Sequence, residues 1–139
     1  MVCVQHVVIP VATEADAEAT CRALEPHLAD LERVSAVHVI EKNVGAPDKA
    51  PMAMRQEEGA DIMATVDREL GDRVAIDTEV WFGSDVVDAL FEATVELGGE
   101  AIAFRARGGS RVVRLLAGDT ASRLVTDPPV PAISLPSVE

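Results

Sequence analysis

The residues best suited to chemistry lie between Glu100 and Leu135, where an apolar run, a glycine turn and a short predicted helix follow one another. Half of the chain's arginines fall in this stretch, namely Arg105, Arg107, Arg111, Arg114 and Arg123. The turn Gly108-Gly109-Ser110 would let backbone amides approach an anion, and a helix beginning near Thr120 would add the positive end of its dipole. This combination predicts a site for a phosphate or a group of like charge.

Each of these features also has a plain structural explanation. Paired glycines mark turns whether or not a ligand is present, and Asp119 is a good N-cap for the helix that begins near Thr120. Arg111 and Arg114 can pair with the plentiful surface carboxylates instead of a phosphate. The segment by itself leaves both interpretations open.

The rest of the chain predicts the strands that would position such a site. Continuous apolar runs at Val7–Ile9 and Ala101–Phe104 are typical of strands buried on both faces. Val34–Ile40 predicts a further strand, and the last is expected at Val130–Leu135. Val74–Phe82 alternates instead, which favours a sheet edge, with these residues inward: Val74, Ile76, Thr78, Val80 and Phe82.

Helices are expected between these strands. The first is capped by Thr13, with Asp16 three residues on, and has an inward stripe of Ala17, Cys21, Leu24, Leu28 and Leu31. A loop at 42–51, expected to be mobile, precedes a helix at Met52–Leu70 whose inward residues are Ile62, Met63, Val66 and Leu70. A third helix is expected to be capped by Ser84 and to end at Gly98-Gly99.

This alternation predicts an α/β fold forming one domain, residues 1–139. We expect a doubly wound five-stranded parallel sheet in the order 3-2-1-4-5, with helices on both faces, an α/β/α sandwich. Ligands of such sheets bind at the carboxyl ends of the strands, where the order reverses between the first and fourth strands. The glycine-rich segment follows the fourth strand, so its expected position agrees with its expected chemistry.

Composition bears on the binding partners, the cellular location and the source organism. At a formal net charge of −12, the chain is expected to be repelled by nucleic acid and by anionic membranes. It has neither a long apolar run nor a signal-peptide pattern, so a cytoplasmic location is expected. Lys42 and Lys49 are the only lysines, and this acidic, lysine-poor composition predicts a halophilic archaeal source, where salt screens self-repulsion. An ordinary acidic mesophilic protein is the alternative.

No catalytic or metal-binding residues can be assigned. Cys3 and Cys21 are expected to be reduced, buried thiols. His6, His27 and His38 share no ligand spacing and are expected to serve packing or the surface. The chain has no G-x-x-x-x-G-K-[ST] loop and no G-x-S-x-G elbow, so a binding protein, at most a slow ATPase, is expected.

Several strings resemble the universal stress protein (UspA-like) family, and the resemblance covers essentially the whole chain. Residues 36–41 (AVHVIE) resemble the end of its second strand, and 83–90 with 96–102 resemble its third crossover. Residues 129–135 (PVPAISL) resemble its closing strand after a proline. The strings are short, but their order and spacing together are characteristic.

The resemblance implies an adenine-nucleotide site, for ATP or AMP, at the carboxyl ends of the first and fourth strands. The candidate residues are Pro10, Val11, Ala12, Val39, Arg105, Gly108, Gly109, Ser110, Gly118, Asp119 and Thr120. Gly108 and Gly118 match the family's glycine pattern. Three positions depart from it: Arg105 replaces its first glycine, Asp119 its Ser or Thr, and Ala12 its Asp beside the adenine or ribose. Because a carboxylate at Asp119 would repel phosphates, the site is expected to be degenerate.

The resemblance also implies a homodimer formed through the last strand. The candidate interface residues are Val130, Ala132, Ile133, Ser134 and Leu135, and an uncovered apolar edge favours such pairing. Two hypotheses follow for a small regulatory or binding domain. One is an adenine-nucleotide-binding domain, and the other is a nucleotide-independent homodimeric interaction module whose crevice is closed by side chains such as Arg105.

Overall fold

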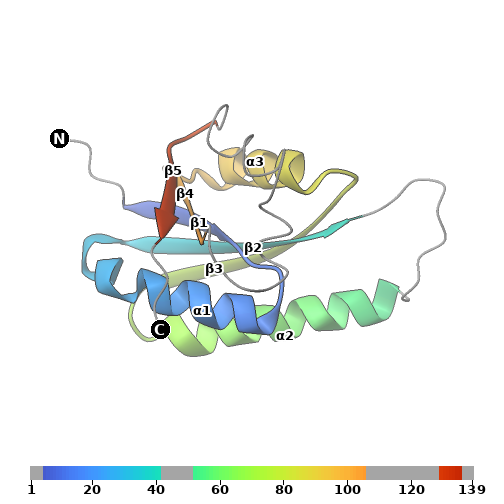
Figure 1. The fold of residues 1–139 in the computed structure, drawn as a ribbon, viewed down its shortest axis with the longest axis horizontal. Coiled ribbons are helices and arrows are strands. Elements are labelled where there is room, and N and C mark those ends of the chain that lie inside the picture. The colour runs from blue at the N-terminus through green and yellow to red at the C-terminus, as the bar shows by residue number, and fades with distance from the viewer. Residues whose placement is uncertain (1–4, 42–51, 106–128, 136–139) are drawn as a thin grey trace.

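The structure is a computed structural model that describes residues 5–41, 52–105 and 129–135 of the 139-residue chain (Figure 1). In chain order, its elements are β1 (His6–Pro10), α1 (Glu14–Leu24), the 3₁₀ helix η1 (Glu25–Asp30), β2 (Arg33–Glu41), α2 (Met52–Leu70), β3 (Ala75–Gly83), α3 (Val86–Leu97), β4 (Ala101–Arg105) and β5 (Ala132–Leu135). The strands form one parallel sheet in the order β3-β2-β1-β4-β5. This confirms the predicted fold class and strand order.

Helices cover both faces of the sheet, with α1 and α2 below it and α3 above it in Figure 1. Successive residues of a buried strand face opposite sides, so β1 contributes Val7 and Ile9 to one core and Val8 to the other. The first core also contains Cys21, Leu24, Ile62, Met63, Val66 and Leu70 of α1 and α2. The second contains Leu90 and Ala93 of α3. Two apolar faces explain why the central strands are continuously apolar in the sequence.

The first helix is shorter than predicted. Thr13 caps α1, as expected, because its hydroxyl accepts a hydrogen bond from the Asp16 amide at 3.0 Å. The α-helix ends at Leu24 and continues as η1, which has Pro26 in its first turn. Proline has no amide hydrogen and crowds the preceding turn, so it does not continue an α-helix. Leu28 remains buried and Leu31 still packs against the core, so the predicted stripe survives the change of helix type.

The start of α3 differs from the prediction by one residue. Asp85, not Ser84, is the N-cap, because its backbone is extended and its carboxylate accepts from the Asp88 amide at 3.0 Å. Asp and Ser are comparable caps, so composition alone could not separate them. The predicted end is confirmed, since Gly98 follows the helix in the left-handed conformation at φ 75°.

Strand β3 lies at the sheet edge, as predicted. The exposure of its side chains alternates less regularly than its apolar and polar residues do. Phe82, expected inward, is 42% exposed at the open end of the strand. Trp81, on the other face, is half-buried against the second core and donates its indole N–H to Glu79 at 2.7 Å. A large amphipathic ring can be covered on the more polar face of an edge strand while its N–H reaches a surface acceptor.

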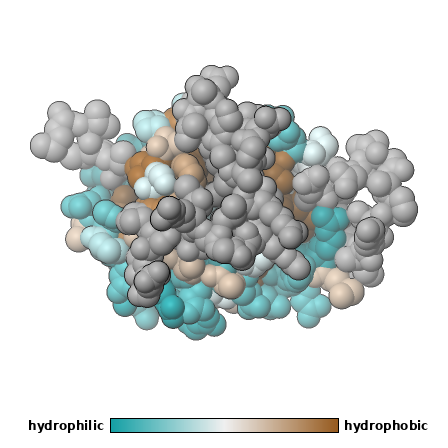
Figure 2. Space-filling view, in the orientation of Figure 1, coloured by the Kyte–Doolittle hydropathy of each residue, from teal (hydrophilic) through white to brown (hydrophobic). Residues whose placement is uncertain are grey.

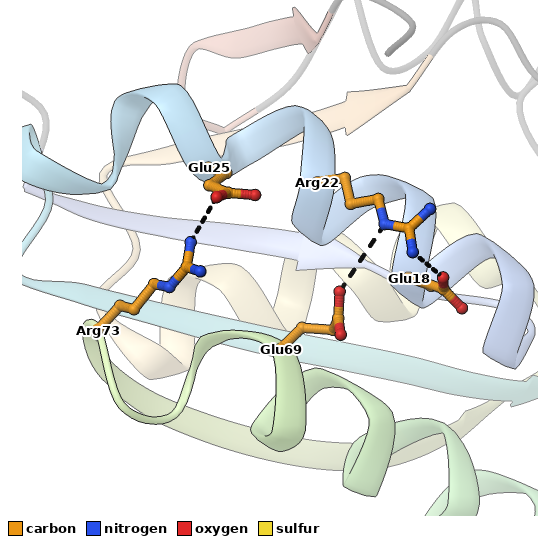
Figure 3. Close-up of polar contacts among 5 residues, drawn as sticks. All are labelled: Glu18, Arg22, Glu25, Glu69 and Arg73. Atoms are coloured by element: carbon orange, nitrogen blue, oxygen red, sulfur yellow. Dashed lines mark ion pairs between the residues drawn. The ribbon is translucent and has the colours of Figure 1, made fainter. Parts of the chain in front are cut away.

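Hydrophilic residues gather over the outer surface of α1 and α2 on the face shown in Figure 2. On this side Arg22 pairs with Glu18 within α1 and reaches Glu69 of α2 at 4.0 Å (Figure 3). Arg73, just after α2, pairs with Glu25 of η1 at 2.7 Å. The Arg22–Glu69 contact joins α1 to α2 electrostatically, and each of these surface pairs contributes little because water and salt screen it. None of the helices in the described ranges is long and apolar enough to cross a membrane.

Candidate functional site

The candidate site begins where β1 and β4 separate. These neighbours are paired at Val7–Ala101 and Val8–Ile102, after which β1 continues to Pro10 and β4 to Arg105. The order of the sheet reverses between them, because β1 leads to β2 on one side and β4 to β5 on the other. In parallel α/β sheets this is the place where ligands bind.

The β1–α1 loop, Val11–Thr13, is held by hydrogen bonds along its length. The Val11 amide donates to the Val37 carbonyl at 3.0 Å, and the Val11 carbonyl accepts from His38 Nδ1 at 2.9 Å. The Ala12 amide donates to Asp16 Oδ2 at 2.8 Å, and the Thr13 carbonyl accepts from the Ala17 amide at 2.8 Å. The loop therefore presents a fixed backbone to the switch point.

Asp16 holds this loop from inside the protein. Its side chain is buried, with the residue only 2% exposed, and its Oδ1 accepts from the Thr20 hydroxyl at 3.2 Å. The carboxyl group of Asp16 is thus buried and bonded both to the loop and to α1. Because Ala12 carries no polar side chain, position 12 offers a ligand only its backbone and an apolar methyl group.

Val39 of β2 directs its backbone groups toward the same switch point. Alternate residues of a strand direct their amides and carbonyls to the same edge, so those of Val39 point toward β1, as the Val37 carbonyl does. The β1–β2 register ends at Pro10–Val37, and no described residue of β1 lies opposite Val39. One donor and one acceptor therefore face the space that β1 leaves, an arrangement suited to the polar edge of a planar base.

The structure brings one half of the predicted site together. Pro10, Val11, Ala12 and Val39 all lie at the carboxyl ends of β1 and β2, and Arg105 is the last residue of β4. The predicted phosphate-binding residues Gly108, Gly109, Ser110, Gly118, Asp119 and Thr120 lie outside the described residues. The predicted loop at 42–51 and the thiol of Cys3 lie outside them as well.

The candidate dimer strand is at the sheet edge, as its sequence predicts. β5 pairs with β4 alone in the described sheet, from Ile102–Ala132 to Arg105–Leu135. Its side chains divide between the two sides: Leu135 is buried in the first core, Val130 and Ala132 pack on the second, and Ile133 is 39% exposed. Ile133 and Ser134 are therefore the candidate residues that remain open to a partner.

Two other groups among the described residues, the Ser35 hydroxyl and the Cys21 thiol, are buried. His6 Nε2 lies 2.7 Å from Ser35 Oγ, a spacing suited to a nucleophile and its base, but Ser35 is fully buried. Burial raises the pKa of Cys21 to about 12, with the carboxylates of Glu69 and Asp16 adding to the shift, so its thiol stays protonated at neutral pH. Within the ranges that the structure describes, no three His, Cys, Asp or Glu side chains gather to hold a metal.

Comparison with known proteins supports the fold through structure rather than sequence. No family model matches the sequence, and a search of curated proteins finds no match. Among solved structures, hypothetical protein MJ0577 has a TM-score of 0.74 at 18% identity, covering 96% of this chain and 96% of that chain. The universal stress protein from Archaeoglobus fulgidus in complex with dAMP has a TM-score of 0.63 at 16% identity, covering 97% and 100% of the two chains.

A universal stress protein family protein from Arabidopsis thaliana, with AMP bound, has a TM-score of 0.64 at 16% identity, covering 94% of this chain and 90% of that chain. The architecture is thus that of an α/β/α sandwich, a parallel sheet with helices on both faces. More narrowly, the chain has the universal stress protein fold.

Two residues that hold the β1–α1 loop carry signals in the sequence. Asp16 belongs to the predicted capping motif, and the structure adds its bond to the Ala12 amide. His38 is expected from the sequence to serve packing or the surface, whereas it reaches across to the Val11 carbonyl. The sequence feature that could have revealed this bond is a polar residue between two inward-facing apolar residues, Ala36 and Ile40, because a polar group on that face needs a hydrogen-bond partner.

Proposed function

We propose that this chain is a member of the universal stress protein family, a small regulatory domain that binds an adenine nucleotide at the carboxyl ends of β1 and β4. The observation that carries the proposal is the separation of β1 and β4 at the switch point, with the Val39 backbone facing the gap. Similarity to nucleotide-bound structures across nearly the whole chain supports the same ligand class.

In this proposal the two halves of the site have different tasks. The β1–α1 loop and Val39 hold the base through backbone groups and apolar contact. Gly108, Gly109, Ser110, Gly118 and Thr120 surround the phosphates, and Arg105 offsets the charge of Asp119. The described residues of the crevice carry binding groups rather than a base or nucleophile, so the site suits a bound signal rather than rapid turnover.

Calorimetry with AMP and ATP in molar KCl tests the proposal. Gly118→Ala should weaken binding, because a side chain would block the approach of the phosphate to the backbone. Asp119→Ser should tighten ATP binding by up to about fivefold, since removing a repulsive charge some 4 Å from a phosphate is worth about 1 kcal/mol in water before salt screens it. The tightening should be smaller for AMP, which carries less charge.

Asp127→Ser is the matched control, because it removes a charge from the same segment outside the glycine pattern and should leave both affinities unchanged. Binding that ignores Gly118→Ala would show that the phosphate loop has been assigned wrongly. If the wild-type chain binds neither nucleotide, the alternative holds, a nucleotide-independent interaction module with a closed crevice.

We further propose that the protein works as a homodimer paired through β5 in a high-salt cytoplasm. The outer edge of β5, which pairs with no further strand among the described residues, and the exposed Ile133 support pairing. The charge of −12 supports an environment in which salt screens repulsion between protomers. Size exclusion with light scattering should show a dimer in molar KCl that dissociates as salt is lowered. A monomer at every salt concentration would contradict the dimer, and a dimer that is stronger in low salt would contradict the high-salt setting.

A further inference from the structure

His38 connects three elements beside the candidate site. It lies on β2 opposite Val80 of β3, with its side chain on the sheet face that α1 and α2 cover. The ring is half-buried, and its Nδ1 lies 2.9 Å from the Val11 carbonyl of the β1–α1 loop. A carbonyl oxygen only accepts, so Nδ1 carries the hydrogen and donates it.

This bond satisfies a group that water does not readily reach. Val11 is 3% exposed, and a buried carbonyl without a partner is costly. The neighbouring loop groups have other partners, since the Val11 amide binds the Val37 carbonyl and the Ala12 amide binds Asp16. Among the described residues, His38 is the partner assigned to the Val11 carbonyl, and so it fixes the orientation of the Val11–Ala12 peptide.

Helix α2 keeps the ring in place. A Cβ at Gly59 would lie 3.3 Å from His38 Cδ2 and 3.2 Å from Val80 Cγ2, so the helix backbone passes close over both side chains. Glycine inside a helix lowers its stability relative to alanine, and here its small size leaves space for the ring. The imidazole is thus enclosed between the sheet and α2, with its Nδ1 directed at the loop.

We propose that His38 is a positioning residue for the nucleotide site, holding the β1–α1 loop in its binding conformation through the Val11 carbonyl. This inference rests on the proposed function. His38 and Val39 divide the work between two adjacent positions: the first secures the loop by its side chain, and the second faces the crevice by its backbone. The loop is then ordered before the ligand arrives, which lowers the entropic cost of binding.

The test compares two substitutions that differ in hydrogen bonding. His38→Leu fills much of the ring's space without a donor, and His38→Asn retains a donor near the position of Nδ1. We expect the dissociation constant for AMP to rise about five- to tenfold in His38→Leu, as for the loss of one net hydrogen bond, and to stay within about twofold in His38→Asn. His6→Leu is the matched control, because His6 is also half-buried and bonded to Ser35 but lies at the amino end of β1.

Amide hydrogen exchange, measured by NMR without nucleotide, gives a second readout. The Ala12 amide should exchange about five- to tenfold faster in His38→Leu than in the wild type, and at the wild-type rate in His38→Asn and His6→Leu. If His38→Asn and His6→Leu weaken AMP binding as much as His38→Leu does, the positioning role is overturned. If the wild type binds neither AMP nor ATP, the proposed function fails, and unchanged Ala12 exchange in His38→Leu then overturns the loop-holding role as well.

Discussion

Replacing Asp16 with alanine is expected to lower the free energy of unfolding by about 3 kcal/mol, because it leaves one buried and one partly buried donor without their acceptor. The Ala12 amide and the Thr20 hydroxyl both bind the Asp16 carboxyl group, and Thr20 is itself buried. The Asp16 amide is also the donor to Thr13, so the side chain and backbone of one residue hold opposite ends of the same turn. Urea denaturation in constant KCl measures the loss.

Two variants separate this effect from ordinary helix capping. Asp16→Asn keeps an oxygen for the Ala12 amide and should recover much of the lost stability. Asp85→Ala removes the N-cap of α3 at an exposed position, where such a loss costs about 1 kcal/mol. An Asp16→Ala variant that loses no more stability than Asp85→Ala would show that burial of this carboxyl group does not strengthen its bonds.

Gly99→Ala is expected to lower the free energy of unfolding by about 2–3 kcal/mol through overpacking. A Cβ at this position would lie 2.6 Å from Val8 Cγ2 and 3.2 Å from Thr94 Cγ2. Neither neighbour has room to move, since both residues are fully buried and the Thr94 carbonyl accepts the Gly99 amide at 3.0 Å. The turn between α3 and β4 therefore packs directly on β1. The same urea titration measures the effect.

The neighbouring glycine provides the control. Gly98 has φ 75°, and no described atom would lie within 4 Å of a methyl group added there, so Gly98→Ala meets backbone strain alone and should cost about 1 kcal/mol. In a Val8→Ala background, which removes the clashing methyl, the penalty of Gly99→Ala should fall by half or more. A penalty that is unchanged in that background would mean that contact with Val8 is not its cause.

The sequence was sufficient for the fold because its strongest signals are set by burial. The runs at Val7–Ile9 and Ala101–Phe104 lie between two cores, and the alternating β3 lies at the edge. The hydrophobic pattern of each strand therefore predicts which of its faces are covered. Details decided by competition among similar residues were less predictable. Ser84 and Asp85 could each cap α3, and the exposure of Phe82 depends on where the cover of the edge strand ends.

For the candidate site, the sequence could predict the switch point of the sheet but not the contacts around it. Strand order alone located that switch point between β1 and β4. The partner of the Val11 carbonyl comes instead from β2, 27 residues along the chain, and no local pattern predicts a bond over that separation. Asp16 was easier to interpret because its partners lie within four residues of it.

The way in which the β1–α1 loop is held has a consequence for how such a protein changes over evolutionary time. The polar groups that Ala12 and Val39 can offer a ligand are main-chain atoms, which every residue type except proline supplies in full. Selection on residue identity should therefore be weaker at those positions than at Thr13, Asp16 and His38, whose side chains hold the loop. Residues that line such a site can be substituted while the backbone keeps its shape. Relatives then become easier to recognise by structure than by sequence.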